Sequence, residues 1–150
     1  FVVQESWPLG PTELRWVETH LASLPNVEFR RAGPPGSGLY GDARVLLVPY
    51  RVDNRPRVIA EAQANGIPVI VGDVPALREA LGDGGLVVPL EDVGEWAAAI
   101  RRAFDDATWY GDLVEGARIH SRRDEIAPHL VAQAFVDLLS GVLERHGIGR

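Results

Sequence analysis

Apolar residues along the chain fall into two alternating patterns. Short continuous runs rich in β-branched residues, such as Val45–Val48 and Pro68–Val71, are bounded by Pro or Gly, which is typical of strands buried on both faces of a parallel sheet. Longer segments between them carry apolar residues at helical spacing. Strands that alternate with helices in this way predict an α/β fold built on a parallel sheet.

The two patterns give approximate bounds for each element. The strands are expected at Phe1–Gln4, Val27–Arg30, Val45–Val48, Pro68–Val71 and Leu86–Val88. The helices are expected at Pro11–Leu24, Pro56–Asn65, Leu77–Leu81, Val93–Phe104, Trp109–His120 and Pro128–His146. The part of the chain after Leu86–Val88 is expected to be helical.

Two helical faces are expected to pack into the core. Trp96, Ile100 and Phe104 share one side of a helix at i,i+4 spacing, which favours a core role for Trp96 over a platform for a sugar ring. A similar face runs along the last helix, at Leu130, Ala134, Leu138 and Val142.

The crossover between the third and fourth strands carries the candidate chemistry. Asp53 follows the third strand and Glu61 lies eight residues later, inside the next helix. Loops that leave the carboxyl ends of parallel strands form the ligand crevice in open sheets, so Asp53 lies at the expected place. Pro56 suits a first helical turn, and Asn54 or Asp53 can supply the capping oxygen. Two carboxylates in this layout suit the hydroxyls of a nucleotide sugar.

Three arginines, Arg51, Arg55 and Arg57, surround the same helix start. Free backbone N–H groups and the positive end of the helix dipole favour anions there, and guanidinium groups match phosphate oxygens. These residues therefore form a candidate diphosphate clamp. The alternative is that the arginines are solvated and that Arg57 pairs with Glu61 at i,i+4.

This segment resembles the signature of retaining GT-B glycosyltransferases of the group 1 family. In that signature, seven residues separate a first Glu from a second Glu. Ala, a small residue, Gly, any residue, Pro and Val then follow in this order, not all of them adjacent. Glu61 and the residues up to Val69 match the second half, and Asp53 replaces the first Glu. The resemblance implies that Glu61 holds the ribose hydroxyls and that Asp53 meets the donor sugar near the reacting centre. It also implies that the backbone from Asn54 to Val58 faces sugar and phosphate.

The resemblance extends from the opening Phe1–Gln4 to Glu91 and Asp92, and implies a Rossmann-like parallel sheet with flanking helices, one half of a GT-B fold. The family's donor domain normally begins with an earlier strand and a Gly-rich loop that carries an Arg and a Lys, and neither is found here. Residues 1–150 are therefore expected to be a single nucleotide-sugar-binding domain from a longer enzyme. The missing parts are that central strand and the N-terminal acceptor domain.

The resemblance implies transfer of a hexose-type sugar from a nucleoside diphosphate donor to an unknown acceptor, with retention of configuration. No cofactor is expected, because cationic side chains and helix-terminal N–H groups, rather than a mandatory metal, stabilise the leaving diphosphate. The expected partners are the nucleotide sugar, the acceptor and the acceptor domain. The isolated domain is expected to be inactive. The alternative is a catalytically inactive nucleotide-binding or scaffold module.

Composition argues against several other classes of protein, including membrane-spanning and nucleic-acid-binding ones. The 46% hydrophobic content suits one globular domain, and no apolar run is long enough for a bilayer. A net charge of −6 argues against a nucleic-acid surface. The absence of Cys excludes disulfides and fits a cytoplasmic protein, with any membrane contact made through the missing domain. The histidines lack metal-ligand spacing, and the loop Gly33–Gly38 either lines the nucleotide base or is a plain surface connection.

Overall fold

The computed structural model describes residues 1–4, 9–30, 40–52, 56–124 and 127–146. The chain divides into two compact units, Phe1–Leu39 and Tyr40–Arg150. The predicted Gly33–Gly38 loop lies outside the described residues, so its two interpretations stay open.

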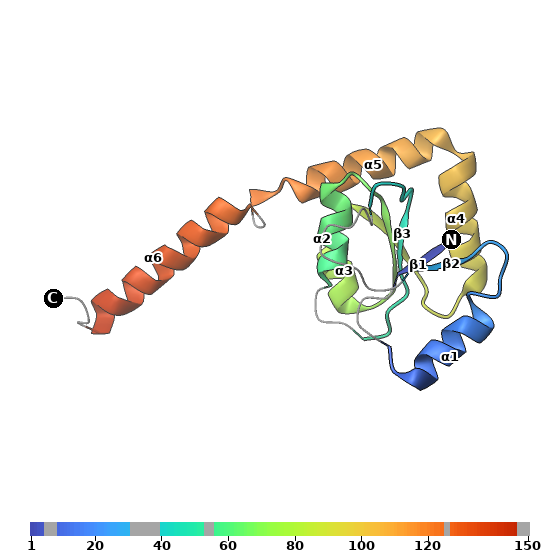
Figure 1. Ribbon diagram of the computed structural model, residues 1–150. Helices are drawn as coiled ribbons and strands as arrows, with labels where there is room; N and C mark the ends of the chain where they lie inside the picture. The colour runs from blue at the N-terminus through green and yellow to red at the C-terminus, as the bar shows by residue number, and fades with distance from the viewer. Residues whose placement is uncertain (5–8, 31–39, 53–55, 125–126, 147–150) are drawn as a thin grey trace. The chain divides into compact units, whose positions relative to one another are not determined.

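The observed elements follow the predicted order and carry the labels of Figure 1. The strands are β1 (Val2–Gln4), β2 (Glu28–Arg30), β3 (Leu46–Val48), β4 (Val69–Gly72) and β5 (Gly85–Val88). The helices are α1 (Pro11–His20), α2 (Arg57–Ala64), α3 (Pro75–Leu81), α4 (Val93–Asp105), α5 (Ala107–Ser121) and α6 (Pro128–His146). The predicted α/β fold with parallel strands and a helical C-terminus is confirmed.

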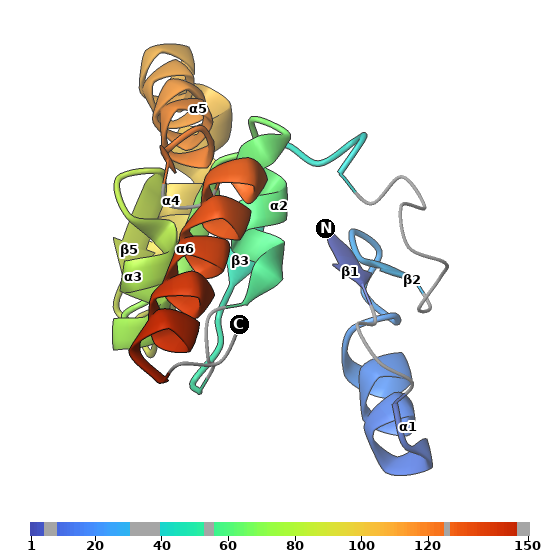
Figure 2. The same cartoon turned by 90° about the vertical axis from the view of Figure 1, so that its left-hand side faces the viewer.

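The first unit contains β1, α1 and β2. The two strands pair in parallel with Val3 opposite Phe29, and Figure 2 shows them side by side. Helix α1 ends at His20, four residues before the predicted Leu24. The residue before a proline is disfavoured in the α region, and Pro25 follows Leu24, so the helix gives way to turns ahead of it.

The second unit is a three-layer arrangement around the parallel sheet β3-β4-β5. All four residues of β4 are buried, as expected for a central strand. Val69 and Val71 pack with α2 and α3 on one face, whereas Ile70 packs with α4 on the other. Figure 1 shows α2 and α3 on the opposite side of this sheet from α4. The alternation follows from the two-residue period of a strand.

Helix α5 packs against α2 and α4. Arg44, just before β3, ties these elements together. Its Nε donates to the carbonyl of Ala103 at 2.9 Å, and its guanidinium lies 3.9 Å from the ring centroid of Tyr110. The Tyr110 hydroxyl donates back to the Arg44 carbonyl at 3.1 Å. A cation near the last carbonyls of α4 also complements the helix dipole.

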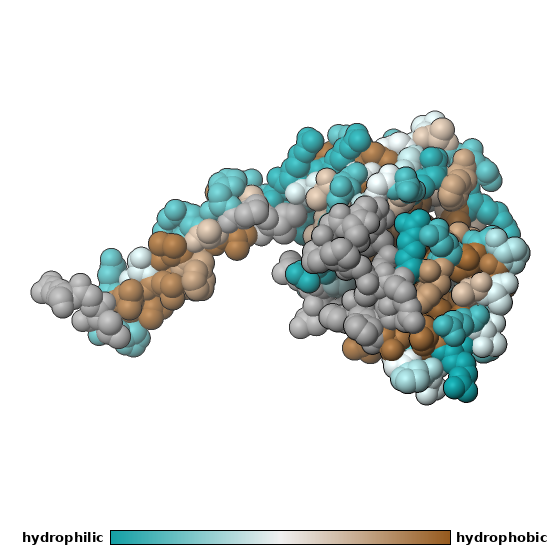
Figure 3. All heavy atoms as spheres, viewed as in Figure 1, coloured by the Kyte–Doolittle hydropathy of each residue, from teal (hydrophilic) through white to brown (hydrophobic). Residues whose placement is uncertain are grey.

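Two of the predicted core faces differ in outcome. Trp96 is half-buried against the second core cluster, so its predicted core role is confirmed, although Phe104 on the same face is 62% exposed. On α6, Leu130 and Leu138 are 39% and 61% exposed, so the predicted core face of this helix is wrong for the described structure. Figure 3 shows apolar atoms along α6. The apolar pattern was real, but it does not say what covers it.

The described helices include none whose length and apolar character together would suffice to cross a membrane. Helix α6, with 19 residues, interrupts its apolar residues with charged and polar ones. That pattern differs from the continuous apolar stretch of a membrane span.

Gln63 is a buried residue of α2, and its side chain bonds to the turn that leads from α3 to β5. Its Nε2 donates to the carbonyl of Leu81 at 2.9 Å and to that of Gly84 at 3.3 Å. The Gln63→Leu substitution keeps the volume but removes this donor. The Leu81 carbonyl still accepts from the Gly84 N–H at 3.1 Å, whereas the Gly84 carbonyl loses the Gln63 donor, so we expect the free energy of unfolding to fall by about 1–3 kcal/mol. Urea denaturation measures this loss. Gln133→Leu on exposed α6 is the matched control, with an expected change within about 0.5 kcal/mol.

Candidate functional site

The loops at the carboxyl ends of β3, β4 and β5 meet around Gly72. A Cβ atom at this position would lie 2.6 Å from Leu90 Cδ1 and 3.6 Å from the Tyr50 carbonyl oxygen. The backbone N–H of Asp73 donates to the Val88 carbonyl at 2.9 Å, which joins the ends of β4 and β5. Glycine therefore lets three loops approach one another at the edge where an open parallel sheet binds its ligands.

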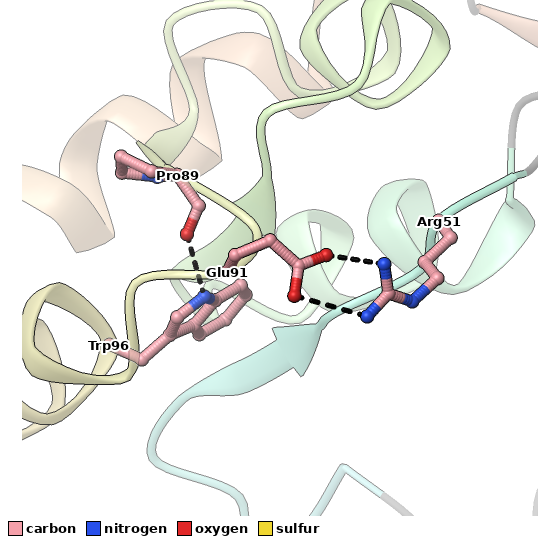
Figure 4. Close-up of polar contacts among 4 residues, drawn as sticks. All are labelled: Arg51, Pro89, Glu91 and Trp96. Atoms are coloured by element: carbon pink, nitrogen blue, oxygen red, sulfur yellow. Dashed lines mark hydrogen bonds and ion pairs between the residues drawn. The ribbon is translucent and has the colours of Figure 1, made fainter.

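Arg51 and Glu91 join two of these loops. Arg51 follows β3 and Glu91 follows β5, and Figure 4 shows the guanidinium and the carboxylate facing each other. The pair is bidentate: Nη1 donates to Oε1, and Nη2 donates to Oε2 at 3.1 Å. The side chains are 72% and 70% exposed, so water screens the attraction and the pair adds little stability. The predicted phosphate ligand Arg51 is thus held by a carboxylate that the sequence did not indicate.

Trp96 fixes the start of the loop after β5, which carries Glu91. Its indole Nε1 donates to the Pro89 carbonyl at 3.1 Å (Figure 4). Asp92 caps α4 by accepting from the backbone N–H of Glu95 at 3.0 Å. The segment that carries Glu91 is therefore anchored on both sides, and Trp96 serves as a structural residue.

Helix α2 begins at this edge, and none of the described residues caps it with a side chain. Pro56 is its N-cap, with no side-chain hydrogen bond to the first turn. Arg57, its first residue, is exposed, while Val58 is half-buried against the core cluster. An uncapped helix start leaves backbone N–H groups for an anion or water. The predicted roles of Arg57 and Val58 are not tested by these positions.

Three predicted site residues, Asp53, Asn54 and Arg55, lie outside the described residues. The expected sugar contact of Asp53 and the expected cap by Asn54 or Asp53 therefore stay predictions. The same is true of the arginine clamp, since only Arg51 and Arg57 are described.

Glu61 is exposed on α2, and its Oε2 accepts a hydrogen bond from the hydroxyl of Tyr40 at 2.7 Å. The alternative ion pair between Arg57 and Glu61 is not formed among the described residues. Burial raises the pKa of Tyr40, and the hydrogen bond to the Glu61 carboxylate raises it further. The sequence did not single out Tyr40. A partly buried tyrosine usually finds a partner for its hydroxyl, but the pattern does not name it.

Asp73 at the end of β4 pairs with Arg78 of α3. Its hydrogen bond with this guanidinium holds the pKa of the carboxyl below its usual range. The N-cap of α3 is Val74, with no side-chain cap, so Asp73 does not cap the helix. Within the described ranges, no group of three or more His, Asp or Glu side chains is placed to hold a metal ion.

The described site offers two chemical functions. The start of α2, which no described side chain caps, suits an anion together with Arg57 and with Arg51 at the sheet edge. The exposed carboxylate of Glu61 can accept hydroxyl hydrogen bonds while Tyr40 occupies part of Oε2. A ligand that has both phosphate and neighbouring hydroxyls matches both functions.

Comparison of the sequence with known proteins identifies the family of this chain. The family described as "Glycosyl transferases group 1" matches residues 8–106, which is more than half of the chain and includes Arg51, Arg57 and Glu61. This agrees with the resemblance found from the crossover motif.

Individual relatives point the same way. The chain is 34% identical over 117 residues to a D-inositol 3-phosphate glycosyltransferase of Acidothermus cellulolyticus, covering 75% of this chain and 26% of that protein. It is 30% identical over 117 residues to the protein of the same name from Corynebacterium kroppenstedtii, with the same coverage. It is 35% identical over 71 residues to O-antigen chain mannosyltransferase B of Escherichia coli, covering 47% of this chain and 19% of that protein.

The chain thus spans about a quarter of the length of the first two relatives. The matched region contains the part of the second unit that runs from its start to the end of α4. This part includes the sheet β3-β4-β5 and the crossover helix α2, which carries candidate residues. The chain therefore belongs to the glycosyl transferases group 1 family.

Proposed function

We propose that this chain is the donor-binding part of a retaining glycosyltransferase that moves a hexose-type sugar from a nucleoside diphosphate to an acceptor. The observation that carries the proposal is the place of Glu61. It occupies the second glutamate position of the family signature, and its carboxylate is exposed on the helix that starts at the ligand edge of the sheet. The names of the relatives, two glycosyltransferases for inositol phosphate and one mannosyltransferase, support glycosyl transfer.

Each residue has a definite role in this proposal. Glu61 accepts hydrogen bonds from the ribose hydroxyls, and Asp53 meets the donor sugar beside the reacting carbon. The backbone from Asn54 to Val58 faces sugar and phosphate. Arginines at positions 51, 55 and 57 offset the charge that develops on the leaving diphosphate, together with the N–H groups at the start of α2. In this proposal, these fixed donors stabilise the leaving diphosphate without a mandatory metal.

The acceptor site belongs to the remainder of the enzyme in this proposal. The chain spans about a quarter of the length of two of its relatives, and in this proposal a further domain of the full-length enzyme binds the acceptor. The chain alone is then a weak nucleotide binder without turnover, in a cytoplasmic enzyme.

A catalytically inactive scaffold is the second candidate, favoured by the replacement of the first signature Glu by Asp53. Thermal unfolding of the full-length enzyme with UDP, GDP or ADP separates the two. A bound nucleotide at a hundredfold excess over its dissociation constant stabilises the fold by about 2.7 kcal/mol, which raises the melting temperature. No shift with any of the three would favour the scaffold and refute the donor site.

The Arg51–Glu91 pair adds a specific expectation. Arg51 must exchange the Glu91 carboxylate for phosphate oxygens if it binds the diphosphate. Glu91→Gln keeps the size and removes the competing charge, so we expect nucleoside diphosphate affinity to rise about two- to fivefold, the usual worth of an exposed pair. Calorimetry on the full-length enzyme measures it.

Two controls accompany the Glu91 experiment. Glu144→Gln makes the same charge change on exposed α6 and should leave affinity unchanged. The gain from Glu91→Gln should also disappear when Arg51 is replaced by Gln. A gain that persists without Arg51 would show that general electrostatics, rather than exchange at this guanidinium, is responsible.

A further inference from the structure

Tyr40 and Glu61 form a contact between two segments of the second unit that lie 21 residues apart in sequence. Tyr40 precedes β3, whereas Glu61 lies on α2. The donor and acceptor are 2.7 Å apart, which is typical for a hydroxyl and a carboxylate. Hydrogen bonds to an ionised acceptor are stronger than neutral ones.

The two partners differ in how firmly they are held. Tyr40 is half-buried and packs against the core cluster between the sheet and helices α2 and α3, which includes Val48 and Ile59. Glu61 is exposed, and its neighbours on the buried side of the helix are Ala62 and Gln63. An exposed glutamate freely samples several rotamers. The anchored phenol therefore restrains a side chain that the helix alone leaves free.

The Tyr40 hydroxyl is a hydrogen-bond donor near neutral pH. Burial and the Glu61 carboxylate raise the pKa of Tyr40, so its hydroxyl stays protonated and remains a donor. The carboxylate has two oxygens with several acceptor positions, and the phenol uses one of them. The remaining positions stay free for the two neighbouring hydroxyls of a ribose.

We propose that Tyr40 is a positioning residue for nucleotide binding: it fixes the Glu61 carboxylate in the rotamer that accepts the ribose hydroxyls. The proposal rests on the donor-binding function above, since it assigns the source of that carboxylate's orientation. Tyr40 itself need not touch the nucleotide. Its effect must then depend on the hydroxyls of the ligand, which a purely structural residue would not show.

Tyr40→Phe tests this directly, because phenylalanine keeps the ring in the core and removes only the hydroxyl. Calorimetry on the full-length enzyme compares UDP, GDP and ADP with their 2′,3′-dideoxy analogues. We expect Tyr40→Phe to weaken binding of the preferred ribonucleotide about tenfold, which is about 1.4 kcal/mol. Binding of the matching dideoxy analogue should not change. An equal loss for both ligands, or no loss for either, would overturn the positioning role.

Tyr110→Phe is the matched control. It also removes a tyrosine hydroxyl that bonds to another segment, here to the Arg44 carbonyl at 3.1 Å. It should lower the melting temperature without changing the ratio of ribonucleotide to dideoxy affinity. A changed ratio in this variant would show that the ratio reports general loosening rather than the orientation of Glu61.

Glu61→Gln separates failure of this inference from failure of the proposed function. If Glu61→Gln weakens ribonucleotide binding and Tyr40→Phe does not, only the positioning role is wrong. If Glu61→Gln has no effect, the ribose assignment itself is wrong. When Glu61 is instead replaced by Ala, adding Tyr40→Phe should cause no further loss of binding, since the side chain that Tyr40 orients is gone.

Discussion

Glu61→Ala in the full-length enzyme is expected to weaken nucleoside diphosphate binding by about a hundredfold. Hydrogen bonds to a charged group contribute about 1.5–3 kcal/mol each, and a hundredfold change is about 2.7 kcal/mol, so the loss of two ribose contacts suffices. The side chain is exposed and forms no ion pair within the described ranges, and its one hydrogen bond is the one it accepts from Tyr40, so its removal should cost only about 1–2 kcal/mol of stability and leave the fold intact. Calorimetric titration with the nucleotide that shifts the melting temperature measures the effect.

The matched control is Glu115→Ala, which removes another exposed glutamate from a helix of the same unit. It changes the net charge equally and should leave binding unchanged. Sugar transfer from the preferred donor should fall in parallel with binding in Glu61→Ala alone. Retained affinity in Glu61→Ala would refute the ribose role, and the family membership would then remain without this site.

The sequence predicted the second unit well because its signals are local. β3, β4 and β5 lie within one residue of their expected bounds, since a continuous β-branched run between Pro or Gly punctuation leaves little choice. Asp92, which accepts from a first-turn N–H, fixes the start of α4 at the predicted Val93. Asp106 caps α5 in the same way, but that helix begins at Ala107, two residues before the predicted Trp109.

The sequence was less informative where tertiary contacts decide. The strands form two sheets, β1-β2 and β3-β4-β5, and strand patterns do not state how many strands pair. The face along α6 was visible as an apolar pattern, yet Phe135 and Leu138 are 60% and 61% exposed. Periodicity identifies a face that needs cover but not the surface that covers it.

In the candidate site, too, the sequence identified the residue that lies in a local motif but not the partners that are distant in sequence. Glu61 was found because a motif of fixed spacing surrounds it. Its partner Tyr40 lies 21 residues earlier, and the partner of Arg51 lies 40 residues later, at Glu91. Each contact needs the sheet to assemble before the two segments meet. No spacing rule along the chain encodes such pairs, which is why the polar network around the predicted residues emerged only from the structure.

Gly85→Ala is expected to have the largest effect on stability. Gly85 starts β5 and pairs with Val69 of the buried central strand. A Cβ atom there would lie 2.2 Å from the Val69 carbonyl oxygen and 2.6 Å from Leu81 Cδ1. Backbone of a strand that is buried on both faces has no room to move, so the pairing of β4 and β5 must open. We expect a loss of more than about 4 kcal/mol, a value reached only by severe steric or polar defects.

Urea denaturation of the variant measures this loss, and loss of soluble protein on expression would be its extreme form. Gly111→Ala is the matched control, because a Cβ on this helical glycine of α5 has no neighbour within 4 Å. That variant should instead gain about 1 kcal/mol, the difference in helix propensity between glycine and alanine. The same substitution thus has opposite signs at two positions. If Gly85→Ala were as stable as the unaltered protein, the close approach of β5 to β4, and with it the placement of the loops after both strands, would have to be abandoned.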